Sequence, residues 1–197
     1  MFTGIVEGTV QVKDTEEAGE GVRVTVERPE FLQEISRGES ISLSGTCLTV
    51  EEFQDKSVKF FLAEETLEKT WFDSVTEGDE LNVEKSLTPE DRMGGHIVQG
   101  HVETSAEVLE VEELDEGWNL RFEKPESLEN LVVHKGFIAV EGISLTVTDI
   151  GEDFFSVTII PETWKVTNLS EKNEGDRINL EPDMMAKYVQ KNLDRLK

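Results

Sequence analysis

The chain of 197 residues contains the same pattern twice, and this duplication limits the folds open to it. Residues 41–84 align with residues 138–181 at a constant offset of 97, with 13 identities in 44 positions and no gap. The shared residues include G-x-x-L-T-V, E-T and E-G-D-x-x-N-x-E, a combination that chance matches between acidic residues do not give. At the start of the copies the offset is 96, and residues 2–12 align with residues 98–108.

A period of 97 residues is too long for a solenoid repeat, so each copy is expected to fold as a module of its own. The hydrophobic content of 37% suffices for two small cores. We therefore expect domains at residues 1–97 and 98–181, followed by a separate segment at 182–197. Residues 85–95 (KSLTPEDRMGG) lack periodicity and are expected to link the domains.

Each copy shows six short segments with hydrophobic residues at alternate positions, as in strands with one buried face. Because closure removes the unpaired edges of so small a sheet, we expect a closed antiparallel barrel in each copy, and a two-sheet sandwich is the alternative. The expected strands lie near residues 6–12, 22–26, 41–43, 48–53, 58–62 and 81–84, and near 102–111, 118–123, 138–141, 145–150, 155–160 and 178–181.

Short helices are expected near residues 29–36, 65–72, 125–133 and 162–169. Pro29 suits the first turn of the first of these helices, and Gly38 suits a left-handed stop after it. Residues 182–197 predict a longer helix of about four turns with an apolar stripe. This helix has no counterpart in the first copy, so we expect it to pack against other subunits, and docking on its own barrel is the alternative. Its stripe comprises Met185, Tyr188 or Val189, Asn192 or Leu193, and Leu196.

The composition is strongly acidic, with 43 Asp and Glu against 19 Lys and Arg and a formal net charge of −24. Such a surface repels phosphate backbones and anionic lipids, so neither nucleic acid nor a membrane is expected as a partner. The acidic residues are spread through the periodic segments, as on a solvated folded surface. We favour adaptation to a salt-rich cytoplasm, where salt screens self-repulsion, over an ordinary acidic protein.

The single cysteine, Cys47, excludes an intrachain disulfide and fits a reducing compartment. The N-terminal segment has no basic region followed by an apolar run, and no stretch approaches membrane-spanning length, so we expect a cytoplasmic protein. His96 and His101 are five residues apart, which suits neither one strand face nor one helix stripe, and no metal site is expected. The G-x-S-x-G, P-loop and G-x-G-x-x-G motifs are absent.

Several positions retained in both copies are glycine or polar, which a core does not require. Glycine lets a backbone approach a flat ligand, and Thr and Glu can hydrogen-bond an amide edge or a polyol, so the copies are expected to bind two similar small molecules. The alternative for Thr66 and Thr163 is helix capping. The retained pairs are Gly4/Gly100, Val6/Val102, Thr49/Thr146, Glu65/Glu162 and Thr66/Thr163.

Other equivalent positions differ, and such differences are expected if one copy holds a donor and the other an acceptor, because chemistry needs an asymmetric pair of groups. A structural role is the alternative for the lone His101 and for Cys47, which neighbours an apolar residue. The differing pairs are Ile5/His101, Thr46/Ile143, Cys47/Ser144 and Leu67/Trp164.

Six motifs stand in a fixed order: MFTGIVEG at 1–8, GTCLTV at 45–50, GGHIVQGHV at 94–102, KGFIAVEGISLTV at 135–147, IPET at 160–163 and AKYV at 186–189. As a set they closely resemble the riboflavin synthase family of the trimeric, duplicated-barrel type, over essentially the whole chain. The resemblance implies an all-β fold of two tandem six-stranded antiparallel Greek-key β-barrels with short helices, plus a C-terminal α-helix at 182–197 that forms a homotrimer.

The resemblance also implies the reaction. Two molecules of 6,7-dimethyl-8-ribityllumazine dismutate by four-carbon transfer to riboflavin and 5-amino-6-ribitylaminouracil, without a metal or organic cofactor. The N-terminal barrel of one subunit faces the C-terminal barrel of another, so two lumazines meet at each site. Association with lumazine synthase is a further partner that the resemblance raises.

Carried over by motif, Ser40, Cys47 and His101 are the expected catalytic residues, and Phe2 is expected to cover the ring. The first barrel is expected to bind substrate through Phe2, Gly4, Ile5, Val6, Cys47, Leu48, Thr49, Phe61, Leu62, Ala63, Glu64, Glu65 and Thr66. The second is expected to bind it through Gly100, His101, Val102, Lys135, Ser144, Leu145, Thr146, Ile159, Ile160, Pro161, Glu162, Thr163 and Trp164. His134 before the KGF motif and Trp164 after IPET depart from the family pattern.

Two other functions compete with the enzyme. Lumazine-carrying antenna proteins resemble the same family and do no chemistry, but the joint retention of Ser40, Cys47 and His101 favours catalysis. A structural or scaffold protein explains neither the paired polar positions nor the helix that occurs once.

Overall fold

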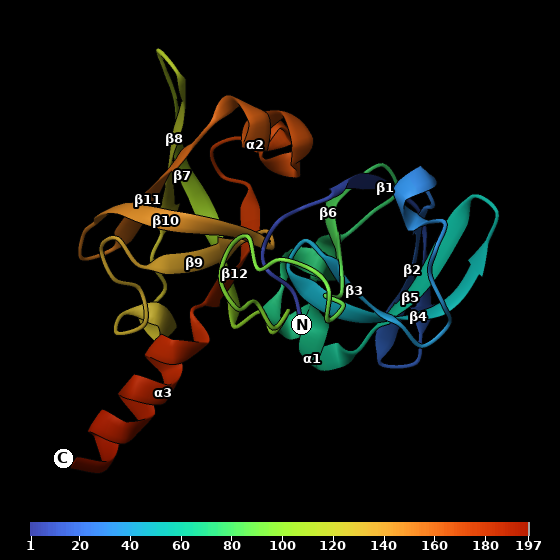
Figure 1. The fold of residues 1–197 in the computed structure, drawn as a ribbon, viewed down its shortest axis with the longest axis horizontal. Helices are drawn as coiled ribbons and strands as arrows, with labels where there is room; N and C mark the ends of the chain where they lie inside the picture. Colours follow the sequence, from blue (N-terminus) through green and yellow to red (C-terminus); the bar gives the residue numbers. More distant parts are fainter. Residues whose placement is uncertain (197) are drawn as a thin grey trace.

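The computed structural model describes residues 1–196 and has two β-barrels side by side, with a helix projecting away from the second (Figure 1). In most strands buried and exposed residues alternate, because successive side chains point to opposite faces, whereas β6 and β12 are buried along nearly their whole length. The first barrel comprises β1 (Gly8–Ala18), β2 (Gly21–Glu27), β3 (Ser40–Leu43), β4 (Thr46–Gln54), β5 (Ser57–Leu62) and β6 (Glu80–Lys85). The second comprises β7 (Thr104–Leu114), β8 (Gly117–Glu123), β9 (Phe137–Val140), β10 (Ile143–Ile150), β11 (Phe154–Ile159) and β12 (Arg177–Pro182).

Both barrels are closed, and all their strand pairs are antiparallel. The strand order around the first is β1-β2-β5-β4-β3-β6, and the second repeats it as β7-β8-β11-β10-β9-β12. In each barrel three consecutive hairpin-connected strands lie beside the strand that precedes them, which is a Greek key. The predicted all-β fold of two tandem barrels is confirmed, and the sandwich alternative is wrong.

Each barrel has a hydrophobic core of its own. In the first, Val24 and Val26 of β2 lie opposite Phe60 and Val58 of β5, and all four are buried. In the second, Phe122 of β8 lies opposite Phe155 of β11, with ring centroids 5.3 Å apart. The two cores fill their barrels with side chains, so a ligand has to bind on an outer face or at an end.

Two of the four predicted short helices form. They are α1 (Glu64–Lys69) and α2 (Pro161–Val166), each followed by a 3-10 turn. Each helix ends at a threonine whose backbone conformation is extended. Thr70 has φ −116° and its hydroxyl donates to the carbonyl of Thr66 at 2.7 Å, and Thr167 does the same to Thr163.

The helices predicted near residues 29–36 and 125–133 were wrong. Each is a single 3-10 turn, Glu30–Leu32 and Glu126–Leu128. In the first, the guanidinium of Arg28 donates to the carbonyls of Leu32 at 3.1 Å and Gln33 at 2.9 Å. These carbonyls are therefore satisfied without a further helical turn. Gly38 has the positive φ expected of it, +85°, but it does not end a helix, because the 3-10 turn ends at Leu32.

A buried polar network joins the barrels around a local two-fold axis. Gly45 and Gly142 pack backbone to backbone there, so closely that a Cβ on Gly45 would lie 2.8 Å from the amide nitrogen of Gly142. The equivalent residues Asn82 and Asn179 each accept a backbone N–H from the other barrel, from Asn168 at 2.7 Å and from Trp71 at 3.1 Å. These bonds fix the barrels relative to one another.

The same network contains a position at which the two copies have different residues. Glu141, which is fully buried, occupies the position that Ser44 has in the first copy, and both have positive φ. The Glu141 carboxylate accepts from Trp71 Nε1 at 2.8 Å, from the Asn179 N–H at 2.6 Å and from Asn168 Nδ2 at 2.8 Å. Three donors compensate the desolvated charge.

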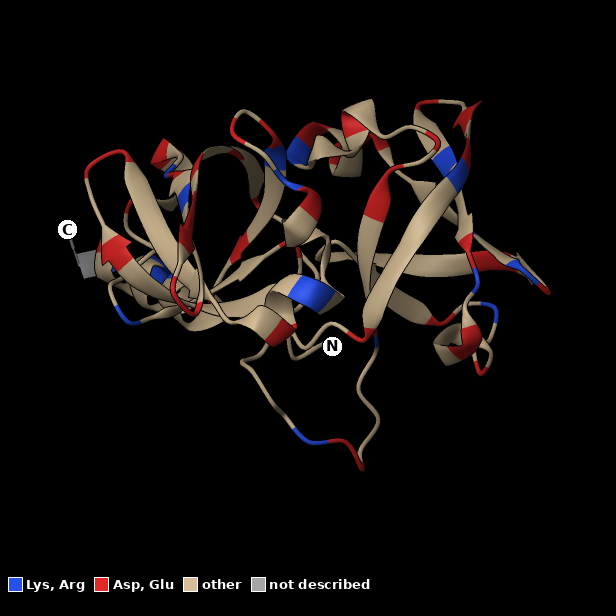
Figure 2. Cartoon of the chain, turned by 90° about the horizontal axis from the view of Figure 1, so that it is seen from above, with Lys and Arg blue, Asp and Glu red and all other residues tan. Residues whose placement is uncertain are grey.

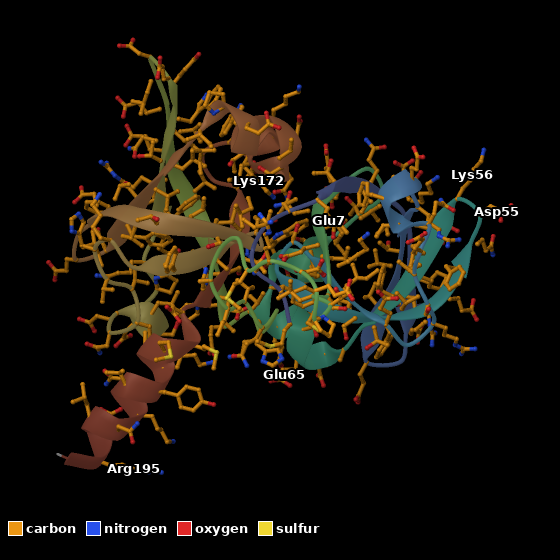
Figure 3. All side chains as sticks on the ribbon, in the orientation of Figure 1. Glu7, Asp55, Lys56, Glu65, Lys172 and Arg195 are labelled. Carbon is orange, nitrogen blue, oxygen red and sulfur yellow. The ribbon has the colours of Figure 1, made fainter. Side chains whose placement is uncertain are left out.

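The C-terminal helix α3 (Met184–Leu193) begins at Asp183, whose carboxylate accepts the Met185 N–H at 2.9 Å. A 3-10 turn, Asp194–Leu196, follows, and Lys197 of the predicted helix lies outside the described residues. In Figure 3 the helix extends away from both barrels toward Arg195. Docking on its own barrel is therefore wrong, because its apolar residues are at least half exposed: Met185, Tyr188, Val189 and Leu193.

Acidic residues are distributed over the strands and turns of both barrels (Figure 2). Ion pairs with the fewer basic residues are partly exposed, as between Arg23 and Glu51 at 2.9 Å and Arg121 and Glu110 at 3.0 Å. Within residues 1–196 no helix is long and apolar enough to cross a membrane.

Candidate functional site

The aligned polar positions lie on the outer faces of β4 and β10. In β4, Leu48 points into the first core and is 5% exposed, whereas Cys47 and Thr49 lie on the opposite face. In β10, Leu145 belongs to the second core. The outward residues of β10 at the equivalent positions are Ser144 and Thr146.

The turns from β5 into α1 and from β11 into α2 border these faces. Leu62 and Ile159 are buried in the cores, so any ligand contact at these positions falls to their backbone. Phe61 is 38% exposed and Ile160 60% exposed. The turns continue into the predicted binding residues Ala63, Glu64, Glu65, Thr66, Pro161, Glu162, Thr163 and Trp164, of which Glu65 projects outward in Figure 3.

The helix-capping alternative for Thr66 and Thr163 is wrong. The residues at the N-caps are Ala63 and Ile160, and neither makes a side-chain capping bond. Both threonines lie inside the first helical turn, so their retention in both copies is left without a capping explanation.

The segments before β1 and β7 cross between the barrels. The carbonyl of Gly100 accepts the Cys47 N–H of the first barrel at 2.9 Å, and the carbonyl of Gly4 accepts the Ser144 N–H of the second at 2.8 Å. A Cβ on Gly100 would lie 2.5 Å from the Cβ of Cys47, and one on Gly4 would lie 2.6 Å from that of Ser144. Only glycine permits this approach.

The crossing corrects the assignment of binding residues to barrels. Gly4, Ile5 and Val6 were expected in the first barrel's site, but they lie against the second barrel, and Val6 packs on the second core. Gly100, His101 and Val102 were expected in the second and lie beside Cys47 of the first. Alignment identifies equivalent residues and does not show which barrel a terminal segment covers. These assemblies are outer-face surfaces where we expect a ligand to bind, and we name them the first pocket, around Cys47, and the second pocket, around Ser144.

Two buried carboxylates hold the crossing segments. Glu181 of β12 accepts the backbone N–H groups of Gln99, Gly100 and His101 at 2.7, 2.8 and 2.9 Å. Glu84 of β6 does the same for the segment before β1, accepting the Thr3 N–H at 2.6 Å and the Gly4 N–H at 2.9 Å. Burial raises the pKa of both carboxyls, and the backbone hydrogen bonds oppose that rise.

Phe2 lies beneath the first pocket. Its side chain is fully buried, and Cys47 packs against the cluster that it forms with Val98 and Ala139. Its backbone bridges to Val98. The expected role of Phe2 as a cover over the ring is therefore wrong, and Phe2 instead supports Cys47 from the protein side.

The structure brings the three expected catalytic residues to one region. His101 is exposed directly after Gly100, whose carbonyl binds Cys47. Ser40 of β3 lies opposite Thr49 of β4, so Ser40 and Cys47 are diagonal neighbours on one face, roughly 7–8 Å apart by sheet geometry.

Lys135 lies before β9 with φ +62°, in the left-handed region. Its equivalent in the first copy is Gly38, for which this conformation is unstrained. A non-glycine residue in this region costs about 1–2 kcal/mol. The strain supports Lys135 as a functional residue, since strained positions gather at ligand sites.

Motif carry-over missed two residues of the second pocket. Trp118 of β8 stacks on Trp164 of α2 with centroids 4.4 Å apart and planes 7° apart. His96 hydrogen-bonds Ser144, Nδ1 to Oγ, at 2.7 Å. A tryptophan at a position where the first copy has Val22 was the available signal for Trp118. Among the described residues, no three His, Cys, Asp or Glu side chains are grouped to hold a metal ion.

Comparison with known proteins gives matches over nearly the whole chain. A family model, Lumazine binding domain, matches residues 3–86 and again residues 99–183. Riboflavin synthase of Bacillus subtilis (strain 168) is 35% identical over 96% of this chain and 88% of its own length. Riboflavin synthase of Schizosaccharomyces pombe is 37% identical, and the match covers 97% of this chain and 93% of the relative. Riboflavin synthase of Escherichia coli (strain K12) is 36% identical, and the match covers 100% of this chain and 93% of the relative.

This chain belongs to the riboflavin synthase family. The two matched stretches of this family member each contain one barrel with the segment that precedes it. Solved structures with the same fold include LumP complexed with 6,7-dimethyl-8-(1'-D-ribityl) lumazine, at a TM-score of 0.84 and 22% identity, and LumP complexed with riboflavin, at 0.86 and 23%. Both matches cover 92% of this chain and 99% of the LumP chain. At such identity the likeness shows the fold alone.

Proposed function

We propose that this member of the riboflavin synthase family converts two molecules of 6,7-dimethyl-8-ribityllumazine into riboflavin and 5-amino-6-ribitylaminouracil. The donor lumazine gives up C6 and C7 with their methyl groups, and the acceptor receives these four carbons as its new ring. Atoms and electrons balance between the two molecules, so no external oxidant or reductant is needed. The observation that carries the proposal is the pair of equivalent outer strand faces, on β4 and β10, which differ chemically at Cys47 and Ser144.

The residues of the first pocket suit the proton transfers that this reaction requires. The acidic protons are those of the lumazine C7 methyl group, and the resulting carbanion attacks the other molecule. His101 can move these protons, because imidazole exchanges protons near neutral pH. Cys47 and Ser40 lie on the same face and are suited to assist addition at C7. Holding two rings in fixed orientation supplies much of the remaining acceleration.

The reaction needs two lumazines in contact, and the assembly we propose is a homotrimer. The first and second pockets lie on different barrels, so the first pocket of one subunit would face the second pocket of another. The exposed apolar stripe of α3 is suited to the trimer contact. Deleting residues 184–197 should give monomers in sedimentation experiments and abolish turnover. A truncated chain that remained trimeric would contradict this assembly.

The proposal also covers the protein's location in the cell, its adaptation to salt and the source of its substrate. We propose a cytoplasmic protein, adapted to high salt, whose lumazine is supplied by lumazine synthase. A stable complex of the two enzymes would appear as co-sedimentation at micromolar concentration.

The rival function is that of a lumazine- or flavin-carrying protein without catalysis; LumP, which shares the fold, was solved with 6,7-dimethyl-8-(1'-D-ribityl) lumazine and with riboflavin bound. Incubating the protein with 6,7-dimethyl-8-ribityllumazine separates the two. The enzyme forms one riboflavin for every two lumazines consumed, measured by absorbance and chromatography. The carrier binds lumazine and leaves it unchanged.

Two variants test whether the chemistry takes place in the first pocket. Cys47→Ser should lower turnover by about 100-fold, because a hydroxyl replaces the better nucleophile, with lumazine binding retained. His101→Ala should lower turnover by a similar factor. Full activity in either variant would remove that residue from the mechanism.

A further inference from the structure

His96 is a buried histidine in contact with the second pocket. Its side chain is 6% exposed and its ring stacks on Phe137, with centroids 5.2 Å apart and planes 12° apart. Nδ1 lies 2.7 Å from Oγ of Ser144, whereas Nε2 is buried without a hydrogen-bond partner in the part of the chain that the structure describes. One ring nitrogen of His96 is thus committed to one hydroxyl.

Ser144 is held from two sides by glycine backbones. A Cβ on Gly4 would lie 2.6 Å from the Ser144 Cβ, and a Cβ on Gly95 would lie 2.8 Å from the Ser144 Oγ. Gly95 immediately precedes His96, so the same short segment packs against the serine and supplies its hydrogen-bond partner. The position of the hydroxyl oxygen is therefore fixed, and His96 determines where its proton points.

The environment of His96 selects its protonation state. Burial lowers its pKa, which the charge of Asp183 opposes, so the ring is neutral at ordinary pH. In a neutral ring one nitrogen donates and the other accepts. If the Ser144 hydroxyl donated to Nδ1, the ring proton would lie on Nε2, where no described residue accepts it; we therefore assign the proton to Nδ1 and leave Nε2 bare. Ser144 Oγ then accepts from His96, and its own O–H is free to donate.

The equivalent position in the first pocket has no such partner. Cys47 occupies it, and within residues 1–196 no side chain hydrogen-bonds its sulfur. A thiol is a weak donor, whereas an oriented hydroxyl is a good one. The two pockets therefore offer a ligand different groups at one equivalent position.

We propose that His96 is a positioning residue that orients the Ser144 hydroxyl as a hydrogen-bond donor toward an acceptor atom of the lumazine pyrimidine ring in the second pocket. The inference rests on the proposed function, since it names lumazine as the ligand. It makes the second pocket the one that gains affinity from an oriented hydroxyl, and the first pocket gains nothing from His96.

The test uses two substitutions that place an amide differently. In His96→Asn the amide nitrogen falls near the position of Nδ1 and keeps the donor to Ser144. In His96→Gln the amide reaches the position of Nε2, so the hydrogen bond to Ser144 is lost, although glutamine is closer to histidine in volume than asparagine is. His134→Gln on the exposed turn is the matched control; His134 Nε2 binds the carbonyl of Thr148 at 3.1 Å.

The probe is a ribityllumazine with oxygen in place of the C7 methyl group, which cannot be deprotonated there and does not react. Calorimetric titration of the whole protein gives the affinities of its two sites, and the site whose affinity changes in Ser144→Ala is assigned to the second pocket. His96→Gln should weaken one site by roughly tenfold, the loss of one hydrogen bond, while His96→Asn and His134→Gln stay within about threefold of the original protein. In a Ser144→Ala background, His96→Gln should cause no further loss.

Three outcomes would overturn the inference. They are a loss of probe affinity at both sites in His96→Gln, a larger loss of affinity in His96→Asn than in His96→Gln, and an equal effect of His96→Gln with and without Ser144→Ala. The first-pocket affinity in each variant serves as the control for folding. A protein that binds two probe molecules per chain and forms no riboflavin from lumazine would refute the proposed function alone. Turnover of lumazine with unchanged second-site affinity in His96→Gln would refute the role of His96 alone.

Discussion

Several residues at the pockets adopt a conformation or a buried position that lowers the stability of the folded protein. Lys135 adopts φ +62° where the first copy has glycine, and Glu84 and Glu181 are carboxyls buried to hold backbone N–H groups. Each arrangement costs free energy of folding locally and is maintained by the surrounding barrel. Such residues predict that some substitutions will stabilise the protein and impair it at once.

Lys135→Gly should raise the free energy of unfolding by roughly 1 kcal/mol, because glycine adopts positive φ without strain. The same substitution should raise the KM for lumazine, since the ammonium group is lost. Lys135→Ala is the control that separates these effects: it removes the ammonium group and keeps the strain. Urea unfolding and steady-state kinetics measure both, and equal stability of the Gly and Ala variants would contradict the strain.

Glu181 should make a pH-dependent contribution to stability. Burial raises its pKa above the value of 4.5 that it has in the unfolded chain, so the folded state binds more protons than the unfolded state above pH 4.5. Its contribution is fully present below pH 4.5 and is lost as the pH rises through the folded pKa. The stability of the original protein minus that of Glu181→Gln should therefore fall as the pH increases from 4.5 toward neutral. A difference in urea unfolding that rises with pH would contradict the raised pKa.

At the residue scale, short-range motifs and the duplication singled out Cys47, Ser144 and His101, and their role in binding or catalysis stays a prediction. The motifs and the duplication did not predict that Glu84 and Glu181 hold the crossing segments, although both were visible as glutamates retained in the two copies. The partners of these carboxylates lie 80 to 82 positions away in the sequence. Pairings at that distance depend on the closed fold.

Among the elements, the strands were predictable and the short helices less so. The sequence pattern identified all twelve strands, because each has a face in a core, although β1 continues to Ala18, six residues beyond its predicted end. The two wrong helices, near residues 29–36 and 125–133, contain apolar residues at helical spacing, and in each range a leucine and a β-branched residue are buried: Leu32 with Ile35, and Leu128 with Val132. A short segment buries both side chains of each pair with only one 3-10 turn.

The contact between the barrels depends on Glu141. Replacing it with the residue of the first copy, as Glu141→Ser, leaves Trp71 Nε1 and the Asn179 N–H without their acceptor. The free energy of unfolding should fall on the order of 3 kcal/mol. Glu112→Ser on the exposed β7–β8 hairpin is the control and should change it by less than about 0.5 kcal/mol. A similar effect of the two substitutions in urea unfolding would show that the network does not stabilise the pairing.

The net charge is a property of the whole molecule. A value of −24 on 197 residues, spread over both barrels, repels itself in dilute buffer. Molar KCl screens this repulsion to within a few ångströms, so the melting temperature should be higher in molar KCl than in dilute buffer at the same pH. Greater stability in dilute buffer would end the idea of adaptation to high salt.

The relation between the barrels was the part that the sequence could not supply. The duplication predicted two equivalent sites, and it led to the wrong barrel for residues 4–6 and 100–102, because equivalence in an alignment says nothing about which neighbour a strand-free segment covers. Gly4 lies over Ser144 and Gly100 over Cys47.

That exchange has an evolutionary consequence. A substitution fixed near Gly100 alters the ligand site of the other half, and one near Gly4 does the reverse, so neither half of the gene is free to specialise alone. An ancestor with a single barrel could have exchanged the same segments between two identical chains, and fusion of those chains would have kept the exchange while allowing Cys47 and Ser144 to diverge.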